Sequence, residues 1–574
     1  MSDQSLMFRR RQLLKLGAAG AGFAALGGMG LLSAQSIATR LAGAAVGADS
    51  VYIEAWPTSP LIKTPFVDPL PVPQALRPIS QDVWSKWVHW QTGKPIVPGP
   101  QPGSQDDMGQ SHQIWPSQLT YQGKAMPDPL IYQIKLQLGL HYFTSSDVLP
   151  INSAGQPSFY FKNGQQIPVT ADSSGIKMPG TTGYMFNGTF PGPRVNNAYG
   201  QPVILRFENH LDENPGNLPR GDFGSPEYGF LTHLHNSHTA PESDGNPHYR
   251  ANQRVNGRQL WSDTDPRSRG YLPGEWVDNL YLNYPAGGND REKQSFFWFH
   301  DHFHNHTGAD VYKGMVGVFP LYDPSSPSLG ANYSDYGDET TGLRLPGVRT
   351  DNGDGSFDVD YDIPLVFYDV RIEDGITPHK DFHNGNGELH PEWWGTSYFR
   401  HFPNHGFVGD LFTVNGTAFP VLEVKRRKYR FRFLDASISR IYDFNLMAST
   451  GGPKAAKDLG YIGDELQGQY RLPDGQQCMR MLQVATGGGL LPNPVYRDHF
   501  ELWPATRREV IIDFSHYQNG NSTSLGDVIY LVNTAKMPDG REPTSPDPAY
   551  KIPMVKFIIT EDAPDNSLDR KSVV

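Results

Sequence analysis

Period-two alternation is plainest in the stretch Tyr132-Gln133-Ile134-Lys135-Leu136-Gln137-Leu138-Gly139-Leu140, where apolar residues alternate with polar or small ones. Successive side chains of a β-strand point to opposite faces of its sheet, so this pattern predicts a half-buried strand. The same alternation recurs at residues 203–208, 429–433, 510–514 and 555–559, and no long segment of helical periodicity competes with it. Glycine (60 residues) and proline (49 residues) are spread along the chain, as short strands joined by turns require. The sequence therefore predicts an all-β fold of sandwich or barrel units.

Length and composition narrow the class of protein further. The chain has 574 residues, which is enough for two or three domains, each with its own core. Hydrophobic residues make up 38% of the chain and charged residues 19%, a balance that argues against both a disordered and an integral membrane protein. The formal net charge is −11 and no basic run occurs beyond the extreme N-terminus, so we expect no nucleic-acid partner.

The N-terminal sequence is typical of an export signal. The run Arg9-Arg10-Arg11-Gln12-Leu13-Leu14-Lys15 precedes a weakly apolar stretch rich in Gly and Ala. A basic tail before a membrane anchor is the alternative, but the Gly and Ala content makes the stretch less hydrophobic than an anchor. We predict a twin-arginine signal peptide over residues 1–48 and export of the folded protein to the periplasm or beyond. No later stretch is long and apolar enough to span a bilayer.

A polar stretch divides the remaining chain. It opens at Asp323-Pro324-Ser325-Ser326-Pro327 and runs to Asp351-Asn352-Gly353-Asp354-Gly355. Such turn-rich sequence is typical of a domain boundary. We therefore predict a first β domain over residues 49–325, a linker over 326–357, a second β domain over 358–562 and a tail over 563–574.

Two His-x-His elements carry the chemistry. The first is Thr232-His233-Leu234-His235 and the second is Phe297-Trp298-Phe299-His300-Asp301-His302. Residues i and i+2 of a strand share a face, so each element aims two imidazoles into one space. One such element is often an accident of composition, but two side by side would present four imidazoles to one cavity, as a polynuclear metal centre needs. Imidazole suits copper, zinc, iron and nickel alike, so the spacing does not choose among these metals.

The sequence around these elements resembles the copper motifs of the multicopper oxidases, in the branch that contains bacterial spore-coat laccase and bilirubin oxidase. Residues 232–245 are similar to the first motif, and residues 298–302, followed by Val311-Tyr312-Lys313-Gly314-Met315-Val316-Gly317, are similar to the second. The resemblance extends over most of residues 60–562. It implies tandem cupredoxin-like Greek-key β domains, copper as the cofactor, and oxygen and a small reducing substrate as partners.

The resemblance also implies a role for each motif residue. His233 matches a ligand of the type 2 copper, whereas His235, His300 and His302 match ligands of the binuclear type 3 pair. Asp244 matches an acidic residue that helps to supply protons for oxygen reduction, although an ordinary Ser-Asp-Gly turn is an equal alternative. Other histidines have no ligand counterpart in the family: we expect pocket residues at His238, His304 and His306, and surface residues at His379, His383, His390, His401 and His405.

One part of the family pattern is missing. The sequence contains neither the His-Pro-x-x-x-His-x-His motif nor the His-Cys-His motif, and Cys478, its single cysteine, has no neighbouring histidine. We therefore expect type 2 and type 3 half-sites without a type 1 site, and a buried structural thiol at Cys478. The expected function is that of a laccase-like polypeptide whose third cupredoxin domain was lost or is supplied by a separate polypeptide.

The sequence is also compatible with two other functions. A stand-alone periplasmic copper-binding or scaffold protein of two cupredoxin domains would also carry the four motif histidines. The compact trimeric two-domain oxidases are a further candidate, but they too require a His-Cys-His motif.

Overall fold

The computed structural model describes residues 56–80, 112–149, 159–162, 165–168, 175–213, 229–245, 270–303, 306–324, 334–380, 387–398 and 406–568, the last range without 539, 542, 545 and 546. The predicted signal peptide over residues 1–48 lies outside these residues. Strands dominate the described chain, so the all-β prediction is confirmed. No helix in the described part of the chain is long and apolar enough to cross a membrane.

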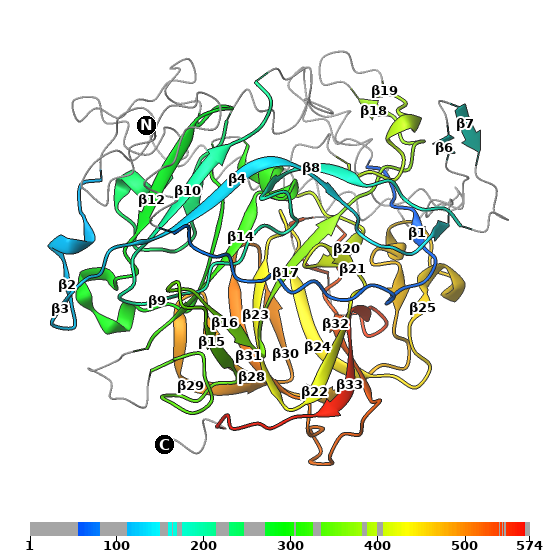
Figure 1. Ribbon diagram of the computed structural model, residues 1–574. Coiled ribbons are helices and arrows are strands. Elements are labelled where there is room, and N and C mark those ends of the chain that lie inside the picture. The colour runs from blue at the N-terminus through cyan, green and yellow to red at the C-terminus, as the bar shows by residue number, and fades with distance from the viewer. Residues whose placement is uncertain are drawn as a thin grey trace, which may run out of the picture. The chain divides into compact units, whose positions relative to one another are not determined.

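Two four-stranded sheets form the first part of the fold (Figure 1). One has the order β12-β10-β4-β8, in which β10 runs parallel to β4 and antiparallel to β12. The other has the order β11-β13-β14-β9. The strands of the two sheets are β4 (Leu130–His141), β8 (Thr181–Phe186), β9 (Asn197–Ala198), β10 (Val203–Asn209), β11 (Thr232–Leu234), β12 (Trp276–Tyr281), β13 (Phe296–Asp301) and β14 (Val316–Tyr322).

A shared aromatic core joins these two sheets. Tyr132 and Ile134 on β4 and Phe207 on β10 pack in one buried cluster with Phe299 on β13 and Phe319 on β14. The predicted strand at residues 132–140 is thus the central part of β4, and its apolar face supplies this core.

Two larger sheets form the second part of the fold. A seven-stranded sheet has the order β21-β20-β17-β23-β31-β28-β29, and a six-stranded sheet contains the path β22-β33-β32-β24-β27 with β30 paired to β24. Their aromatic core includes Phe367, Phe431, Phe433, Phe444 and Phe557. The strands are β17 (Asp362–Val370), β20 (Leu411–Val414), β21 (Thr417–Ala418), β22 (Val421–Arg426), β23 (Lys428–Asp435), β24 (Tyr442–Ala448), β27 (Gln476–Met479), β28 (Met481–Thr486), β29 (Gly489–Arg497), β30 (His499–Leu502), β31 (Arg507–Asp513), β32 (Val528–Asn533) and β33 (Ile552–Asp562).

Short elements complete the described chain. Paired short strands are β1 (Leu61–Ile62) with β5 (Val148–Leu149), β2 (Thr120–Tyr121) with β3 (Lys124–Ala125), β6 (Phe159–Lys162) with β7 (Gln165–Pro168), β15 (Val348–Asp351) with β16 (Phe357–Asp360), β18 (His379–Lys380) with β19 (Gly387–Glu388), and β25 (Lys454–Ala455) with β26 (Tyr470–Arg471). One α-helix is α4 (Thr307–Tyr312). The single-turn 3₁₀ helices are η2 (Pro116–Gln118), η5 (Pro241–Ser243), η7 (Ala286–Gly288), η8 (Asp290–Glu292), η10 (Pro391–Trp393), η12 (Ala456–Leu459) and η13 (Gly463–Leu466).

The expectation of half-buried strands is wrong for β23, because its polar face is also buried. Arg430 and Arg432 are 0% exposed. The Arg432 guanidinium donates two hydrogen bonds of 2.7 Å to the two carboxylate oxygens of Asp362, and Arg430 donates from Nε to Glu509 at 2.8 Å. Buried charges are tolerated when they are paired in this way. Burial alone would raise the pKa of the Asp362 carboxyl, but the charges of Arg432 and Arg430 lower it to about 2.

The first and second parts of the fold share a core. A single buried cluster contains Phe190, Trp298 and Val316 from the first part and Tyr368 and Leu434 from the second. The division at residues 326–357 stays a prediction, because described residues from both parts pack in this shared cluster.

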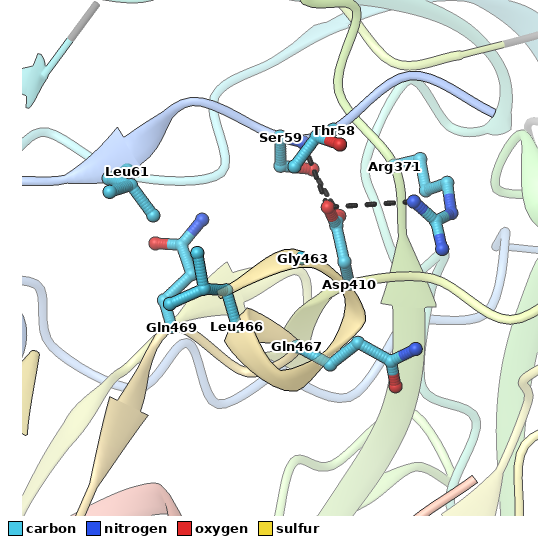
Figure 2. A pocket seen from close by; sticks show the side chains of 9 residues that line it. All are labelled: Thr58, Ser59, Leu61, Arg371, Asp410, Gly463, Leu466, Gln467 and Gln469. Atoms are coloured by element: carbon cyan, nitrogen blue, oxygen red, sulfur yellow. Dashed lines mark hydrogen bonds and ion pairs between the residues drawn. The ribbon is translucent and has the colours of Figure 1, made fainter. Parts of the chain in front are cut away.

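The segment before β1 is tied to the second part of the fold by polar contacts. Figure 2 shows Ser59 and Arg371 on either side of the Asp410 carboxylate. The Ser59 backbone donates to Asp410 at 2.9 Å, and the Arg371 guanidinium lies 3.7 Å from the same carboxylate. Burial raises the pKa of Asp410, although Arg371 and the Ser59 hydrogen bonds oppose that rise. These contacts fix the start of the described chain.

Candidate metal centre

Strands β11 and β13 place the two His-x-His elements side by side. They are antiparallel neighbours, and His233 lies opposite His300 in their register. Leu234, the central residue of the first element, and its register partner Phe299 point the other way, into the core between the sheets. The four imidazoles therefore gather on one face of the sheet, as the i, i+2 spacing predicts.

The four rings lie within contact distance of one another. The ring centroids of His233 and His302 are 4.6 Å apart, those of His235 and His300 are 5.5 Å apart, and those of His233 and His300 are 5.6 Å apart. His300 is buried, whereas His233, His235 and His302 are partly exposed. The cluster is thus closed on the side of the core and accessible on the other.

Backbone carbonyls fix the orientation of three of these rings. The Nδ1 atoms donate from His233 to the Asp244 carbonyl at 2.6 Å, from His300 to the Asp301 carbonyl at 2.7 Å, and from His302 to the Gly245 carbonyl at 3.0 Å. A carbonyl only accepts, so each Nδ1 carries the proton and each Nε2 keeps a free lone pair. This is the arrangement by which proteins prepare imidazoles as metal ligands.

His235 is held differently. Its Nδ1 lies 3.3 Å from Nε2 of His300. Because the proton of His300 is on Nδ1, its Nε2 lone pair faces the His235 ring. Burial lowers the pKa of His235 to about 3, with further contributions from the charges of Arg507 and His233. Burial likewise lowers the pKa of His300. Both rings are therefore neutral at physiological pH, as metal ligands must be.

The donor set suits copper, but these residues do not complete a coordination sphere. Imidazole nitrogen is a preferred ligand of copper and zinc. Within the described part of the chain, no three His, Cys, Asp or Glu side chains are arranged to hold one metal ion. Two converging rings, as in the His235 and His300 pair, supply two ligands at most. Any ion bound here would need further ligands.

A buried aromatic ring beside the imidazoles and a buried carboxyl pair support the cluster. Trp298 stacks on His300 with ring centroids 4.1 Å apart and on His235 with centroids 5.1 Å apart. The Asp301 carboxylate accepts from the backbone of Leu231 at 2.9 Å, which links the start of β11 to the end of β13. Burial raises the pKa of Asp301, and it also raises the pKa of the neighbouring Asp310 to about 7.

Asp244 serves the site through its backbone. Its carbonyl receives the His233 proton at 2.6 Å, while its carboxylate oxygen lies 3.3 Å from the same nitrogen. The Asp244 side chain is 44% exposed. It sits at the end of the 3₁₀ turn η5, with Gly245 next in the left-handed region at φ +71°. Both the turn interpretation and the proton-supply interpretation of Asp244 fit this geometry.

The other histidines lie apart from the cluster or outside the described residues. His238 is exposed, 3.8 Å from the Glu292 carboxylate, and His306 stacks on Phe303 at the start of α4. His390 stacks on Trp393 with centroids 3.7 Å apart. Only the backbone of His379 is described, and His304, His383, His401 and His405 lie outside the described residues.

Cys478 has the surroundings of a structural thiol. It packs at the edge of the second core, and burial raises its pKa to about 12. Its Sγ lies 3.6 Å from the Leu446 carbonyl. A thiol that holds its proton this firmly is a poor metal ligand, because metal binding requires the thiolate.

Comparisons of sequence and structure find known proteins that are similar to this chain. No family model matches the chain. The chain is 26% identical over 404 residues to a laccase of Bacillus subtilis, an alignment that covers 68% of this chain and 61% of that protein. It is 26% identical over 386 residues to a bilirubin oxidase of Albifimbria verrucaria, covering 67% of this chain and 47% of that protein. A solved laccase structure from Pediococcus acidilactici aligns with 90% of this chain and 69% of that chain, at 17% identity and a TM-score of 0.45.

The chain is a relative of the multicopper oxidases. Its sequence relatives within that group carry the names laccase and bilirubin oxidase. It spans about half to three fifths of the length of these curated relatives, 47% of one and 61% of another.

Proposed function

We propose that this chain is a laccase-like multicopper oxidase polypeptide. Its function is the copper-dependent one-electron oxidation of phenolic or related donors, or of metal ions, coupled to the reduction of oxygen to water. One observation carries the proposal: in a cluster of four imidazoles, His233, His300 and His302 each donate from Nδ1 to a backbone carbonyl, which leaves Nε2 unprotonated, and His235 Nδ1 faces His300 Nε2 at 3.3 Å. Folding alone does not require four imidazoles with this orientation.

Different residues of the chain would have different roles at this site. Copper bound there would supply the one-electron redox chemistry that oxygen reduction needs. The carbonyls of Asp244, Asp301 and Gly245 hold the rings in the ligand tautomer. Oxygen reduction to water consumes protons, and the Asp244 carboxylate, partly exposed and beside His233, is placed to pass them from solvent.

The ligand set of this chain is half of the family's trinuclear cluster. We infer type 2 and type 3 half-sites, with His233 in the first and His235, His300 and His302 in the second. No residue of the sequence matches the type 1 site, because Cys478 lacks neighbouring histidines. The remaining ligands would come from a further cupredoxin domain or from a separate polypeptide. The twin-arginine sequence at Arg9-Arg10-Arg11 supports assembly of the protein before export to the periplasm or beyond.

A second function is supported by the incomplete coordination of the site. A periplasmic copper-binding or scaffold protein of two cupredoxin domains would need no electron entry site. The converging rings of His235 and His300 would be enough for copper binding without oxidase activity.

Copper binding and oxygen uptake separate these functions. The chain without residues 1–48 is titrated with Cu(II), and oxygen consumption is followed with a phenolic donor, with and without a polypeptide that carries the two missing motifs. The oxidase proposal predicts copper binding by the chain alone, slow oxygen uptake alone, and faster uptake after completion. Copper binding without oxygen uptake in either case would support the copper-binding protein instead. A chain that binds copper no better than a variant with all four histidines changed to alanine would overturn both proposals.

A further inference from the structure

Arg507 connects the second part of the fold to both His-x-His strands. It lies at the start of β31 and is 3% exposed. Its Nε donates to the Phe296 carbonyl at 3.0 Å, at the start of the strand that carries His300. Its Nη1 donates to the Asn236 side-chain oxygen at 3.1 Å, in the residue that follows His235. One guanidinium therefore contacts both the segment that precedes His300 and the segment that follows His235.

Arg507 contacts the turn that follows His235. Asn236 follows His235 directly and adopts a left-handed backbone at φ +69°. The turn closes with a hydrogen bond of 3.1 Å from the Ser237 amide to the Leu234 carbonyl. An asparagine tolerates this backbone conformation, but with some conformational cost. The contact with Arg507 fixes the direction in which the chain leaves His235.

The same face of β31 makes a second contact with β13. Glu509 lies two residues after Arg507, so both side chains point to one face of the sheet. The Glu509 carboxylate accepts from the Ser295 hydroxyl, and the Ser295 carbonyl accepts from Arg432 at 2.6 Å. Residues 295 and 296 are thus both fixed from β31 or its neighbour β23. The start of the strand that carries His300 is therefore held by hydrogen bonds to the second part of the fold.

From this geometry we propose that Arg507 is a positioning residue for the metal centre, which acts through Asn236 on His235. The inference rests on the proposed function and extends it, because it gives a residue outside the copper motifs a role in orienting the imidazoles. The planar guanidinium reaches separate acceptors in fixed directions, whereas a lysine ammonium presents a single point of charge. Arg507→Lys should therefore restore the role only in part.

The chain offers a matched control for the loss of a buried arginine. Arg471 is 2% exposed and donates to the backbone carbonyls of Gln467 at 2.9 Å and Tyr470 at 3.0 Å. Its hydrogen bonds go to residues 465–470 and not to the His-x-His strands. Arg471→Gln thus removes a buried guanidinium and its hydrogen bonds to carbonyls, as Arg507→Gln does. It does not remove a contact with Asn236.

The test measures Cu(II) affinity of the full chain by calorimetry for Arg507→Gln, Arg507→Lys and Arg471→Gln, below the unfolding temperature of each. We expect Arg507→Gln to weaken copper binding about 10–100-fold, as loss of a residue that orients a ligand does. Arg507→Lys should lose less, and Arg471→Gln should bind like wild type. In a His235→Ala background, Arg507→Gln should cause no further loss. Wild-type affinity in Arg507→Gln, or an equal loss in both backgrounds, would overturn the proposal.

A second measurement does not depend on copper. Arg507→Gln should speed hydrogen exchange at the Ser237 amide at least tenfold, while Arg471→Gln should leave that amide unchanged. If wild-type chain binds no copper, the proposed function fails, and this exchange experiment still decides whether Arg507 fixes the turn. Unchanged exchange at Ser237 in Arg507→Gln would overturn the positioning role.

Discussion

Nδ1 of His235, which directly follows β11, and Nε2 of His300 on β13 face each other across 3.3 Å. Since the His300 proton is donated to the Asp301 carbonyl, at least one lone pair points into this gap. Two imidazole nitrogens that converge in this way are poised to share one cation. This pair is therefore the part of the cluster where metal binding should be most sensitive to substitution.

We expect His235→Ala and His300→Ala each to weaken copper binding by more than the roughly 10–100-fold cost of losing an outer hydrogen-bond partner. The physical reason is that each substitution removes half of a two-nitrogen site. Calorimetric titration with Cu(II) measures the effect. His499→Ala is the control, because His499 is exposed and pairs with Asp443 at 2.7 Å on the second part of the fold. Equal copper affinities for His235→Ala and His499→Ala would show that the pair of His235 and His300 does not bind the metal.

Local sequence patterns predicted that the imidazoles of each element share a face, but not what surrounds them. The i, i+2 spacing of His233 and His235 is a local property of a strand, so the shared face could be read directly. The pairing of His233 with His300 depends on the register of β11 and β13, which alternation does not specify. The contact between Arg507 and Asn236 joins residues 271 positions apart, and no signal in the sequence marks it. Gly245 was visible as a turn residue, but its carbonyl bond to His302 was not.

Alternation also overstated the exposure of some strands. Arg430 and Arg432 occupy the polar positions of a pattern that predicts a solvent-facing side. They are buried because Asp362 and Glu509, which come from other strands, neutralise them. The leucines of β4 show the reverse, since Leu140 is 58% exposed despite its apolar character. Period two identifies the strands, but burial depends on what covers each face.

The two roles of Asp244 can be separated by substitution. Asp244→Asn keeps the backbone carbonyl that accepts from His233, so we expect copper affinity to stay within about twofold of wild type. If the carboxylate supplies protons, oxygen uptake by the completed enzyme should fall by about 10²–10⁴-fold. Parallel copper titration and oxygen-electrode measurements check this. Unchanged oxygen uptake would leave Asp244 with a turn role alone.

Gly245 should be required both for stability and for the orientation of His302. Its φ is +71°, and an added Cβ would lie 2.3 Å from the Thr232 carbonyl oxygen, next to His233. We expect Gly245→Ala to destabilise the fold by about 1–3 kcal/mol and to weaken copper binding, since the Gly245 carbonyl would move away from His302. Urea unfolding and copper titration measure the two effects.

Gly353 supplies the control for Gly245→Ala. It has a similar φ of +79°, but an added Cβ there would meet nothing within 4 Å. Gly353→Ala therefore reports the cost of the left-handed backbone alone, about 1 kcal/mol, with copper binding intact. Equal results for the two variants would show that the close approach to Thr232 has no role.

The buried pair of Asp362 and Arg432 should make stability depend on pH in the acid range. The pKa of Asp362 is lowered to about 2 in the fold, against an ordinary value of about 4 in the unfolded chain. A lowered folded pKa stabilises the fold above the unfolded pKa, and that contribution is lost as pH falls from about 5 to about 2. The difference corresponds to about 2–3 kcal/mol at neutral pH.

Asp362→Asn should remove this contribution and leave the Arg432 guanidinium with Glu509, 3.4 Å away, as its remaining charged partner. We expect a loss of about 3–5 kcal/mol in unfolding free energy at pH 7, because removing one partner from a buried ion-pair network is costly. The difference from wild type should shrink as pH falls below about 4, where the Asp362 carboxyl becomes protonated in the unfolded chain but stays largely ionised in the fold. Asp351→Asn is the control, since Asp351 pairs with Arg349 at 2.8 Å but is 72% exposed, and exposed pairs contribute little. Urea unfolding of the three proteins across pH 3–7 measures these differences. A difference between wild type and Asp362→Asn that did not change with pH would show that the Asp362 charge is not what stabilises this network.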